Sequence, residues 1–517
     1  MGKTKAADGR TRLNYPKTIL TGFGFMASSI AWAIYDPYIT KILNKLLSES
    51  PLVARWSESI GNLPFLEPFM AINTVGGAAT AGAFTLVPLF IGIIMTFDNV
   101  FGVIFQPTFG KLSDHCHSRL GKRRPFILIG APISAVLFAL IPWMGSLPAV
   151  MACVILFVFV MSLWRAPVVA LMPDLTPPEL RSDGNAVINL MGGVGGLVGM
   201  IAGTIVMTIY SIARGLPKDQ IDEFDTFPVV FLIGSVVMIA GTIMLMLFVK
   251  EKDSRLLSSD VLAARSEEER RAAEKKAKAE DKLARKAMKL SGGERKSLIF
   301  MLACLFFLFC GANAIQTFFA LFADEVLHIQ TAGATLLMAL FGLFSLLSAI
   351  PAGKLGQKIG RKKTILIGLG LFLAAFVVFF AVFLAVLGRE GLSIGEFITL
   401  NGSGSGEVSG IIATLGKLIY PVMVIAGVAN MMITVNTLPL VLEIGGTERV
   451  GTFTGFYYTA TFSAQIASPI VYGFFRMFSG SYISLFYYSP IMFVLALLAI
   501  LFVRHGEAKK LEEVPAN

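Results

Sequence analysis

Twelve long apolar runs constrain the fold of this chain more than any other feature of its sequence. A helix needs about 20 mainly apolar residues to cross the hydrocarbon core of a bilayer. The runs that meet this requirement lie at residues 18–41, 84–109, 124–145, 149–172, 185–210, 227–249, 298–322, 331–352, 364–388, 415–440, 450–476 and 483–504. Charged residues make up only 15% of the 517 residues, whereas soluble domains have about 25%. The sequence therefore predicts an all-α membrane protein with twelve transmembrane helices.

A charged segment divides the twelve runs into two sets of six. We expect an N-terminal six-helix half over 1–249, a cytoplasmic linker over 250–296 and a C-terminal six-helix half over 297–517. Within the linker, Ser266-Glu267-Glu268-Glu269 has the pattern of a capping box that opens an alanine-rich helix. We interpret this helix as solvated, with docking on anionic lipid or on a partner as the alternative.

Lys and Arg are distributed unequally among the segments that connect the runs. The segments on the same side as the N-terminus hold many more of them than the segments on the opposite side, and such residues are enriched in cytoplasmic loops. This predicts a multi-pass protein of the plasma or inner membrane with both termini in the cytosol. The net charge of +10 arises in these loops, so it does not indicate nucleic-acid binding.

Two long connections lie on the predicted outer side. Residues 42–83 contain three prolines and are expected to form short interfacial helices. Residues 401–406, Asn-Gly-Ser-Gly-Ser-Gly, have the composition of a flexible linker. Asn401 also begins a glycosylation sequon, which we interpret as a coincidence. The four cysteines fall in predicted spans or in a cytoplasmic loop, and we expect no disulfide among them.

Glycines recur every four residues along the fifth predicted span, at Gly195, Gly199 and Gly203. Such a stripe of small residues allows another helix to approach closely. We expect it to be a packing surface, along which close helices could also slide if the two halves rock against each other.

One loop motif occurs twice, once in each half. After the second span the chain reads Gly-Lys-Leu-Ser-Asp over 110–114 and Gly-Lys-Arg-Arg over 121–124, and a degraded copy lies over 353–363. The motif resembles the loop signature of the major facilitator superfamily. This resemblance implies a duplicated transporter with the major facilitator fold, which works by alternating access.

The residues around the first copy of the motif carry a more specific resemblance. Residues 106–127 include Gln-Pro before the motif and Ser-Arg-Leu-Gly-Lys-Arg-Arg-Pro-Phe-Ile at its end. This pattern is similar to that of the sucrose–proton symporters and of the wider glycoside–pentoside–hexuronide cation symporters. The likeness covers the N-terminal half well and the C-terminal half weakly. It implies symport of a sugar, a disaccharide or glucoside such as sucrose or maltose, with a cation.

Four positions depart from those families. Val158 and Val169 stand where the plant sucrose carriers have an aspartate and an arginine, and Gly102 and Gln106 stand where melibiose-type carriers have two cation-binding acids. Since Na⁺ is a hard cation that prefers carboxylate oxygens, these departures favour proton coupling over sodium coupling.

Asp98 and Arg165 are charged residues that lie deep within predicted spans. From the helix rise, Asp98 lies about 18 Å and Arg165 about 13 Å from the cytoplasmic face. We therefore expect the two side chains to meet across the second and fourth spans, where Arg165 would hold Asp98 ionised until the pair separates. This would make them the proton-coupling site. The alternative is a static ion pair that serves only the architecture.

Four other charged residues are candidates for gating. Asp36 lies about 28 Å above Lys17, near the predicted outer end of the first span, so we expect it at an outer gate rather than at the proton site. Asp114 can cap the N-terminus of the eleventh span and pair with Arg123 and Arg124 of its own motif. The resemblance implies that this latch favours the outward-facing state.

Sugar hydroxyls are bound by side chains that stack or that both donate and accept hydrogen bonds. Trp32 offers an apolar face to a sugar ring, although an interfacial anchor is an equal alternative. The candidate amides lie in the seventh, tenth and eleventh spans: Asn313, Gln316, Asn430, Asn436 and Gln465. Each amide alone could instead hold two helices together.

Motifs for other functions are missing or weak in the sequence. The chain contains no Gly-x4-Gly-Lys-Ser/Thr phosphate loop, and no nucleophile–base pair is evident. His115-Cys116-His117 cannot wrap around one metal ion, because its three residues are adjacent. We therefore predict no enzyme activity, no cofactor and no metal, and we expect a monomer that binds a sugar, protons and lipid. The alternatives are a sodium-coupled glycoside symporter, a drug-efflux carrier or, more remotely, a membrane sensor that transports nothing.

Overall fold

The computed structural model describes residues 4–5, 11–12, 14–64, 84–116, 118, 120–176, 180–249, 292–404, 406–445 and 450–504. Most of the predicted linker, residues 250–291, lies outside this part of the chain. The expected linker helix therefore also lies outside the described residues, and the boundaries of the two halves stay a prediction.

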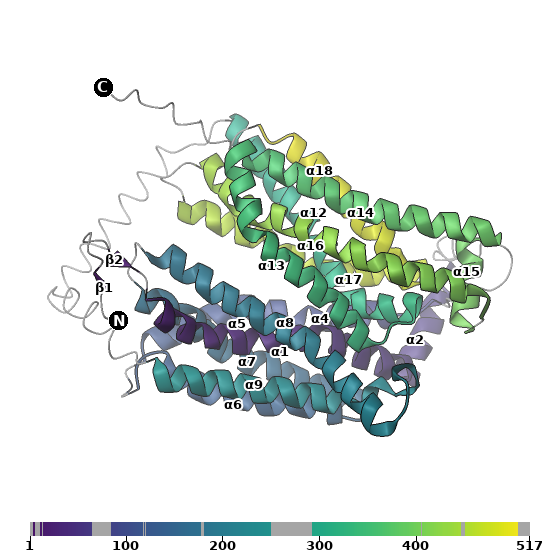
Figure 1. Cartoon of the computed structure of the whole chain (residues 1–517), viewed down its shortest axis with the longest axis horizontal. Coiled ribbons are helices and arrows are strands. Elements are labelled where there is room, and N and C mark those ends of the chain that lie inside the picture. The colour runs from purple at the N-terminus through teal and green to yellow at the C-terminus, as the bar shows by residue number, and fades with distance from the viewer. Residues whose placement is uncertain are drawn as a thin grey trace.

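Each of the twelve predicted spans is helical in the structure (Figure 1). The helices of the first half are α1 (Tyr15–Ser48), α2 (Pro51–Gly61), α4 (Val87–Met95), α5 (Phe97–Asp114), α6 (Arg124–Leu140), α7 (Leu147–Leu175), α8 (Arg181–Arg214) and α9 (Phe227–Phe248). Those of the second half are α12 (Gly292–Leu327), α13 (Thr331–Ile359), α14 (Arg361–Glu390), α15 (Ile394–Gly402), α16 (Ser409–Gly445), α17 (Val450–Ser479) and α18 (Leu485–Leu501). Two strands, β1 (Thr4–Lys5) and β2 (Thr11–Arg12), pair antiparallel.

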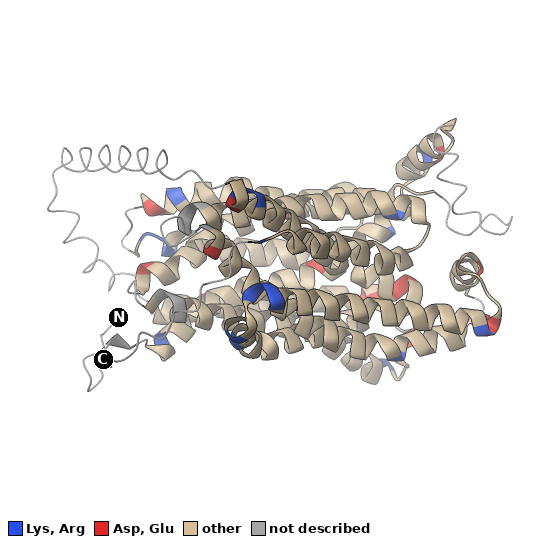
Figure 2. Cartoon of the chain, turned by 90° about the horizontal axis from the view of Figure 1, so that it is seen from above, with Lys and Arg blue, Asp and Glu red and all other residues tan. Residues whose placement is uncertain are grey.

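The length and apolar character of the helices fit a membrane. Within the described residues, 11 helical segments are long and apolar enough to span a bilayer. The twelfth, α17, has 30 residues, but its Thr, Tyr, Ser and Gln residues make it less apolar. Figure 2 shows that long stretches of the helices between the two ends carry no charged side chain. The predicted twelve-helix membrane fold is confirmed.

The six spans from α1 to α9 lie beside the six from α12 to α18 (Figure 1). Helix α1 packs mainly on α8 and α9, and α12 packs on α17 and α18. We call the end of the bundle at which α1 begins and α18 ends the terminal end. The opposite end, where α2 and α15 lie, is the distal end.

Two sequence expectations about the distal end need correction. The first span does not end at residue 41, because α1 continues to Ser48. Residues 401–402, predicted as the start of a flexible linker, belong to the end of α15. This helix begins with a capping box formed by Ser393 and Glu396. The side chain of Asn401 is buried and donates to the carbonyl oxygen of Glu325 at 2.6 Å. The expectation of a short helix within 42–83 is confirmed by α2.

The glycine stripe of α8 packs against α1, as the small-residue spacing predicts. A β-carbon at Gly195 would lie 2.5 Å from the carbonyl oxygen of Met26, and one at Gly199 would lie 2.9 Å from that of Ile30. Since α1 and α8 belong to the same half, these contacts are packing within that half. The stripe therefore fixes the spacing of α1, which carries several residues of the central cavity.

We expect Gly195→Ala to lower the thermal stability of the purified protein, because the new methyl group would strike backbone atoms of α1. Overpacking of this kind costs about 1–3 kcal/mol. Gly196→Ala is the matched control, since a β-carbon at the neighbouring position would meet no atom within 4 Å and alanine favours the helix. Melting temperatures in detergent compare the two variants. Equal melting temperatures of the two variants would show that the contact between Gly195 and Met26 is not tight.

Candidate functional site

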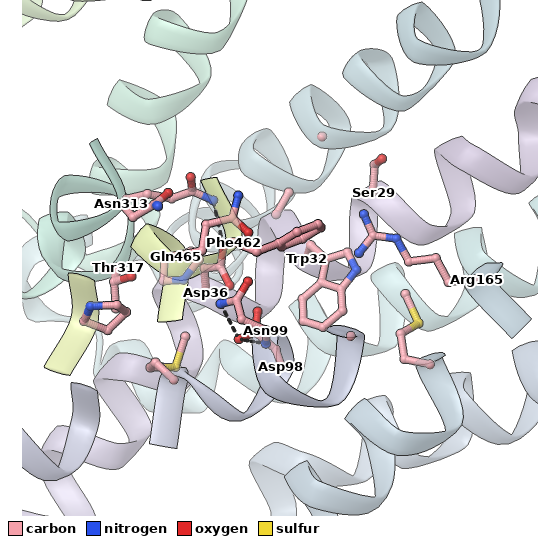
Figure 3. A pocket seen from close by; sticks show the side chains of 18 of the residues that line it. Ser29, Trp32, Asp36, Asp98, Asn99, Arg165, Asn313, Thr317, Phe462 and Gln465 are labelled. Carbon is pink, nitrogen blue, oxygen red and sulfur yellow. Dashed lines mark hydrogen bonds between the residues drawn. The ribbon is translucent and has the colours of Figure 1, made fainter. Parts of the chain in front are cut away.

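A cavity of about 500 Å³ lies between the two halves. The first half contributes α1, α4, α5, α7 and α8 to its walls, and the second half contributes α12, α13 and α17. The side chains with polar atoms in its walls are Ser29, Trp32, Asp36, Asp98, Asn99, Gln106, Ser162, Arg165, Asn313, Gln316, Thr317 and Gln465. Figure 3 shows most of these side chains converging from the two halves.

The predicted second span is interrupted where it passes the cavity. Helix α4 ends at Met95 and α5 begins at Phe97. The hydroxyl of Thr96 donates to the carbonyl oxygen of Gly92 at 2.8 Å, and to that of Ile466 in the other half at 3.3 Å. Because of this break, Asp98 falls in the first turn of α5, where the helix dipole favours a negative charge.

Asp98 lines the cavity, and its hydrogen-bond partner is the neighbouring residue, Asn99. Its carboxylate accepts hydrogen bonds from the backbone N–H and the side-chain amide of Asn99, at 2.6 and 2.8 Å. Arg165 lines the same cavity, with its guanidinium 5.7 Å from the ring centre of Trp32. The ion pairs found in the described part of the chain do not include one between Asp98 and Arg165. The two residues line the same cavity, but the expected contact between their side chains is not formed in this structure.

Asp36 lies in the same cavity rather than at the outer end of its span. Its predicted place near the mouth was wrong because α1 extends beyond residue 41, to Ser48. Its carboxylate accepts a hydrogen bond from the side chain of Gln316 at 3.0 Å, so it bridges the two halves (Figure 3). Pro37 follows within α1 and has no N–H to donate to the carbonyl oxygen of Ala33. Ala33 is also among the residues that line the cavity.

Three of the five candidate amides line the cavity: Asn313, Gln316 and Gln465. The amide nitrogen of Asn313 and the indole nitrogen of Trp32 are buried donors with no hydrogen-bond partner in the structure. A buried donor without a partner costs free energy. Both atoms are therefore suited to a ligand with acceptor oxygens.

The two amides of the tenth span, α16, are placed elsewhere. Asn436 is buried, and its amide donates to the carbonyl oxygens of Met432 and of Ala352 on α13. It fills the space left by Gly356, where a β-carbon would lie 1.8 Å from its side-chain oxygen. Asn430 is half-buried and does not belong to the cavity lining. Asn436 therefore joins helices, and neither residue forms part of the cavity wall.

Two lining residues that were not predicted, Ser29 and Ala33, lie on the same face of α1 as Trp32 and Asp36. Ser29 precedes Trp32 by three residues, and Ala33 precedes Asp36 by three. Phe462, Gln465 and Pro469 likewise lie three or four residues apart on one face of α17. Ser29 and Ala33 could have been predicted from this helical spacing once Trp32 and Asp36 had been selected.

The loop motif forms a compact polar cluster at the terminal end. Arg123, only 6% exposed, donates to Asp174 at 2.9 Å and to the carbonyl oxygen of Gly110 at 3.1 Å. It also pairs with Asp114, as the sequence predicts. Arg124 donates to the carbonyl oxygen of Met246, which ties α6 to α9. The cluster therefore joins α5, α6 and α7 within one half.

The predicted capping of the eleventh span by Asp114 involves the segment 446–449, just before α17. That segment lies outside the described residues. The described residues contain no group of three His, Cys, Asp or Glu side chains placed to hold a metal ion, and His117 of the His-Cys-His segment is not among them.

Curated relatives match short parts of the chain. The sucrose transport protein SUC3 of Arabidopsis thaliana is 29% identical over 124 residues, which cover 20% of this chain and 21% of that protein. The membrane-associated transporter protein of Homo sapiens is 27% identical over 164 residues, which cover 28% of this chain and 29% of that protein. The chain thus aligns with less than a third of either relative.

Solved structures match almost the whole chain at low identity. A D-xylose–proton symporter has a TM-score of 0.55 at 16% identity, over 94% of this chain and 96% of that one. The nucleoside transporter NupG, as a D323A mutant, has a TM-score of 0.55 at 12% identity, over 94% and 100%. At such identities the likeness concerns the fold alone. The family model described as Major Facilitator Superfamily matches residues 18–421 and 301–516. With its twelve helices in two sets of six around a central cavity, the chain belongs to the Major Facilitator Superfamily of membrane transporters.

Proposed function

We propose that this transporter is a proton-coupled sugar symporter that works by alternating access. The observation that carries the proposal is the composition of the cavity between the halves, which combines acids, one base, an aromatic ring and amide donors. The likeness of part of the chain to a sucrose transport protein supports a sugar as the substrate. A disaccharide or glucoside, such as sucrose or maltose, is the substrate that we expect.

The charges in the cavity favour coupling to a cation. Among the described residues that line it, Asp36, Asp98 and Arg165 are the ones with ionisable carboxyl or guanidinium groups. With both acids ionised, the three groups sum to one negative charge, and one added proton makes the cavity neutral. An uncompensated charge is costly in a low-dielectric interior. We therefore propose that the loaded carrier changes state with one of the two acids protonated, and Asp98 is our candidate.

The other side chains of the cavity are suited to the hydroxyl groups of a sugar. Asn313 and Trp32 offer unpaired donors from the two halves, while Gln316 and Gln465 can donate and accept. Gln316 already bonds to Asp36 across the halves. A sugar that takes over these bonds would contact both halves at once, so its binding would be sensitive to their relative position. Asp114, Arg123 and Arg124 remain our candidates for gating at the terminal end.

Uptake of labelled sugars into proteoliposomes tests this function. We expect sucrose or maltose to accumulate when an inward pH gradient is imposed, and to equilibrate without accumulation when it is absent. Accumulation driven by a sodium gradient would instead show that Na⁺ is the coupling ion. Asp36 and Asp98 would then supply the carboxylate oxygens that bind it. No uptake of any sugar in a panel of disaccharides and glucosides, by protein shown to be folded, would overturn the proposal.

We further propose that the distal end faces the outside of the cell, that both termini are cytoplasmic, and that the monomer is the working unit. Ser403, exposed beside the end of α15, tests the orientation. We expect Ser403→Cys in intact cells to react with a thiol reagent that does not cross membranes. Reaction only after permeabilisation would reverse the proposed orientation.

A further inference from the structure

Lys41, near the distal end of α1, is a buried cation that contacts acids from both halves of the transporter. Its exposed fraction is 7%. The ammonium group lies 3.0 Å from a carboxylate oxygen of Glu223, which belongs to the first half, in the short helix η6 (Glu223–Asp225). It also pairs with Asp324 of α12, in the second half. We call Lys41, Glu223 and Asp324 the distal triad.

Further contacts between the halves surround the distal triad. The second carboxylate oxygen of Glu223 accepts the backbone N–H of Thr331, the first residue of α13, at 2.8 Å. The side chain of Gln330 donates to the carbonyl oxygen of Ile221 at 3.0 Å. Thr204 of α8 donates to the carbonyl oxygen of Ala332 at 2.8 Å. Polar contacts therefore join the two halves around the distal triad.

We infer that Lys41 is the residue that holds the distal end closed, by joining Asp324 of the second half to Glu223 of the first. Without the ammonium group, the two carboxylates would lie close together across the boundary of the halves, and their repulsion would favour separation. In a state with the distal end open, the same two acids lie apart in water and need no cation. Lys41 thus interacts more favourably with the closed state, which is what a residue must do to shift the equilibrium.

Lys41 has one ion-pair partner in each half, and this arrangement allows the distal triad to separate. When the halves separate, Glu223 stays beside Lys41, because both belong to the first half, so the lysine is not left unpaired. Of the two ion pairs of Lys41, only the one with Asp324 must break. The side chain of Asp324 is already 38% exposed, so water can replace the lysine there. A pair buried completely on both sides would resist this separation far more.

Access to the cavity from the distal face measures the state of this end. We would introduce Met200→Cys, at a position that lines the cavity, in a chain with Cys116→Ser, because the other three native cysteines are buried. A thiol reagent that does not cross membranes is applied to the face at which Ser403→Cys reacts. We expect Lys41→Met to raise the labelling rate of Met200→Cys about tenfold, since breaking a buried pair is strongly destabilising. Lys41→Arg should largely keep the parent rate.

The matched control is Asp225→Asn. It removes the ion pair between Asp225 and Arg214, which lies at the same end but within the first half and is about half exposed. We expect no change in labelling from this variant. Asp324→Asn weakens the ion pair of Lys41 with the second half and leaves Lys41 paired with Glu223. This variant replaces Lys41→Met in the test if Lys41→Met does not fold. An unchanged labelling rate in Lys41→Met, or in Asp324→Asn if only that variant folds, would overturn the inference.

The inference requires only that the transporter alternates access, which is independent of the substrate and of the coupling ion. The labelling is measured without sugar and without a gradient. Failure of sugar uptake would therefore leave this test unaffected, and an unchanged labelling rate would leave the proposed symport standing.

Discussion

Asp98→Asn is expected to abolish accumulation of sugar driven by a pH gradient, while sugar exchange down its own gradient continues. The amide mimics a permanently protonated carboxyl group, so the cavity no longer needs a proton in order to become neutral. A gradient of one pH unit supplies about 1.4 kcal/mol per proton, which corresponds to about tenfold accumulation. We expect this factor to fall to about one in the variant. Uptake and counterflow in proteoliposomes measure the two activities separately.

Asp36→Asn is the informative companion to this variant, because Asp36 faces the same cavity and also bonds to Gln316. Its loss should weaken the contact between the halves as well as remove an acid, so we expect slower exchange in addition to any change in coupling. If Asp98→Asn keeps full accumulation, Asp98 is not the proton carrier, and Asp36 becomes the next acid to test.

Trp32→Ala is expected to raise the sugar concentration for half-maximal transport by about 10- to 100-fold. The variant removes the ring on which we propose that the sugar stacks, and it removes the unpaired indole donor. Stacking and one hydrogen bond of about 0.5–1.5 kcal/mol together account for a loss of this size. Initial rates of uptake over a range of sugar concentrations measure it.

Trp32→Phe separates these two contributions. It keeps a ring and loses the N–H, so we expect a several-fold effect, smaller than that of alanine. Trp143→Ala is the control, because Trp143 is 69% exposed at the distal end and lies outside the cavity. An unchanged half-saturation concentration in Trp32→Ala would show that the tryptophan packs against Tyr35 and Phe157 and does not bind the sugar.

The number and order of the helices could be predicted from the sequence because the bilayer imposes a simple requirement on length and polarity. The ends of the helices could not, since polar residues near a helix end are compatible with either a helix or a loop. Lys41 is an example: the first span was predicted to end at this residue, yet its ion pairs with Glu223 and Asp324 allow α1 to continue. The misplacement of Asp36 followed directly from that error.

The charged residues of the candidate site could be predicted from the sequence, because a charge within an apolar run stands out. The amide residues were predicted less well, because an amide in a span has two common roles. Asp98 and Arg165 could be selected from the sequence because a charged residue within a membrane span is rare and usually functional. Both line the cavity. An asparagine in a span can bind a ligand or join two helices, and only packing distinguishes Asn313, with its unpaired amide nitrogen, from Asn436, whose amide bonds to α13. The distal triad could not be predicted, because its members are far apart in the sequence.

The movement of protons on addition of sugar shows whether the protein transports the two together. Proteoliposomes in a weakly buffered medium, with no gradient of pH or of any other ion, receive sugar from outside while the pH of the medium is recorded. We expect the medium to become more alkaline as the sugar enters with protons, and we expect Asp98→Asn to take up sugar without this change. Sugar uptake by the unmodified protein with no change in the pH of the medium would contradict it.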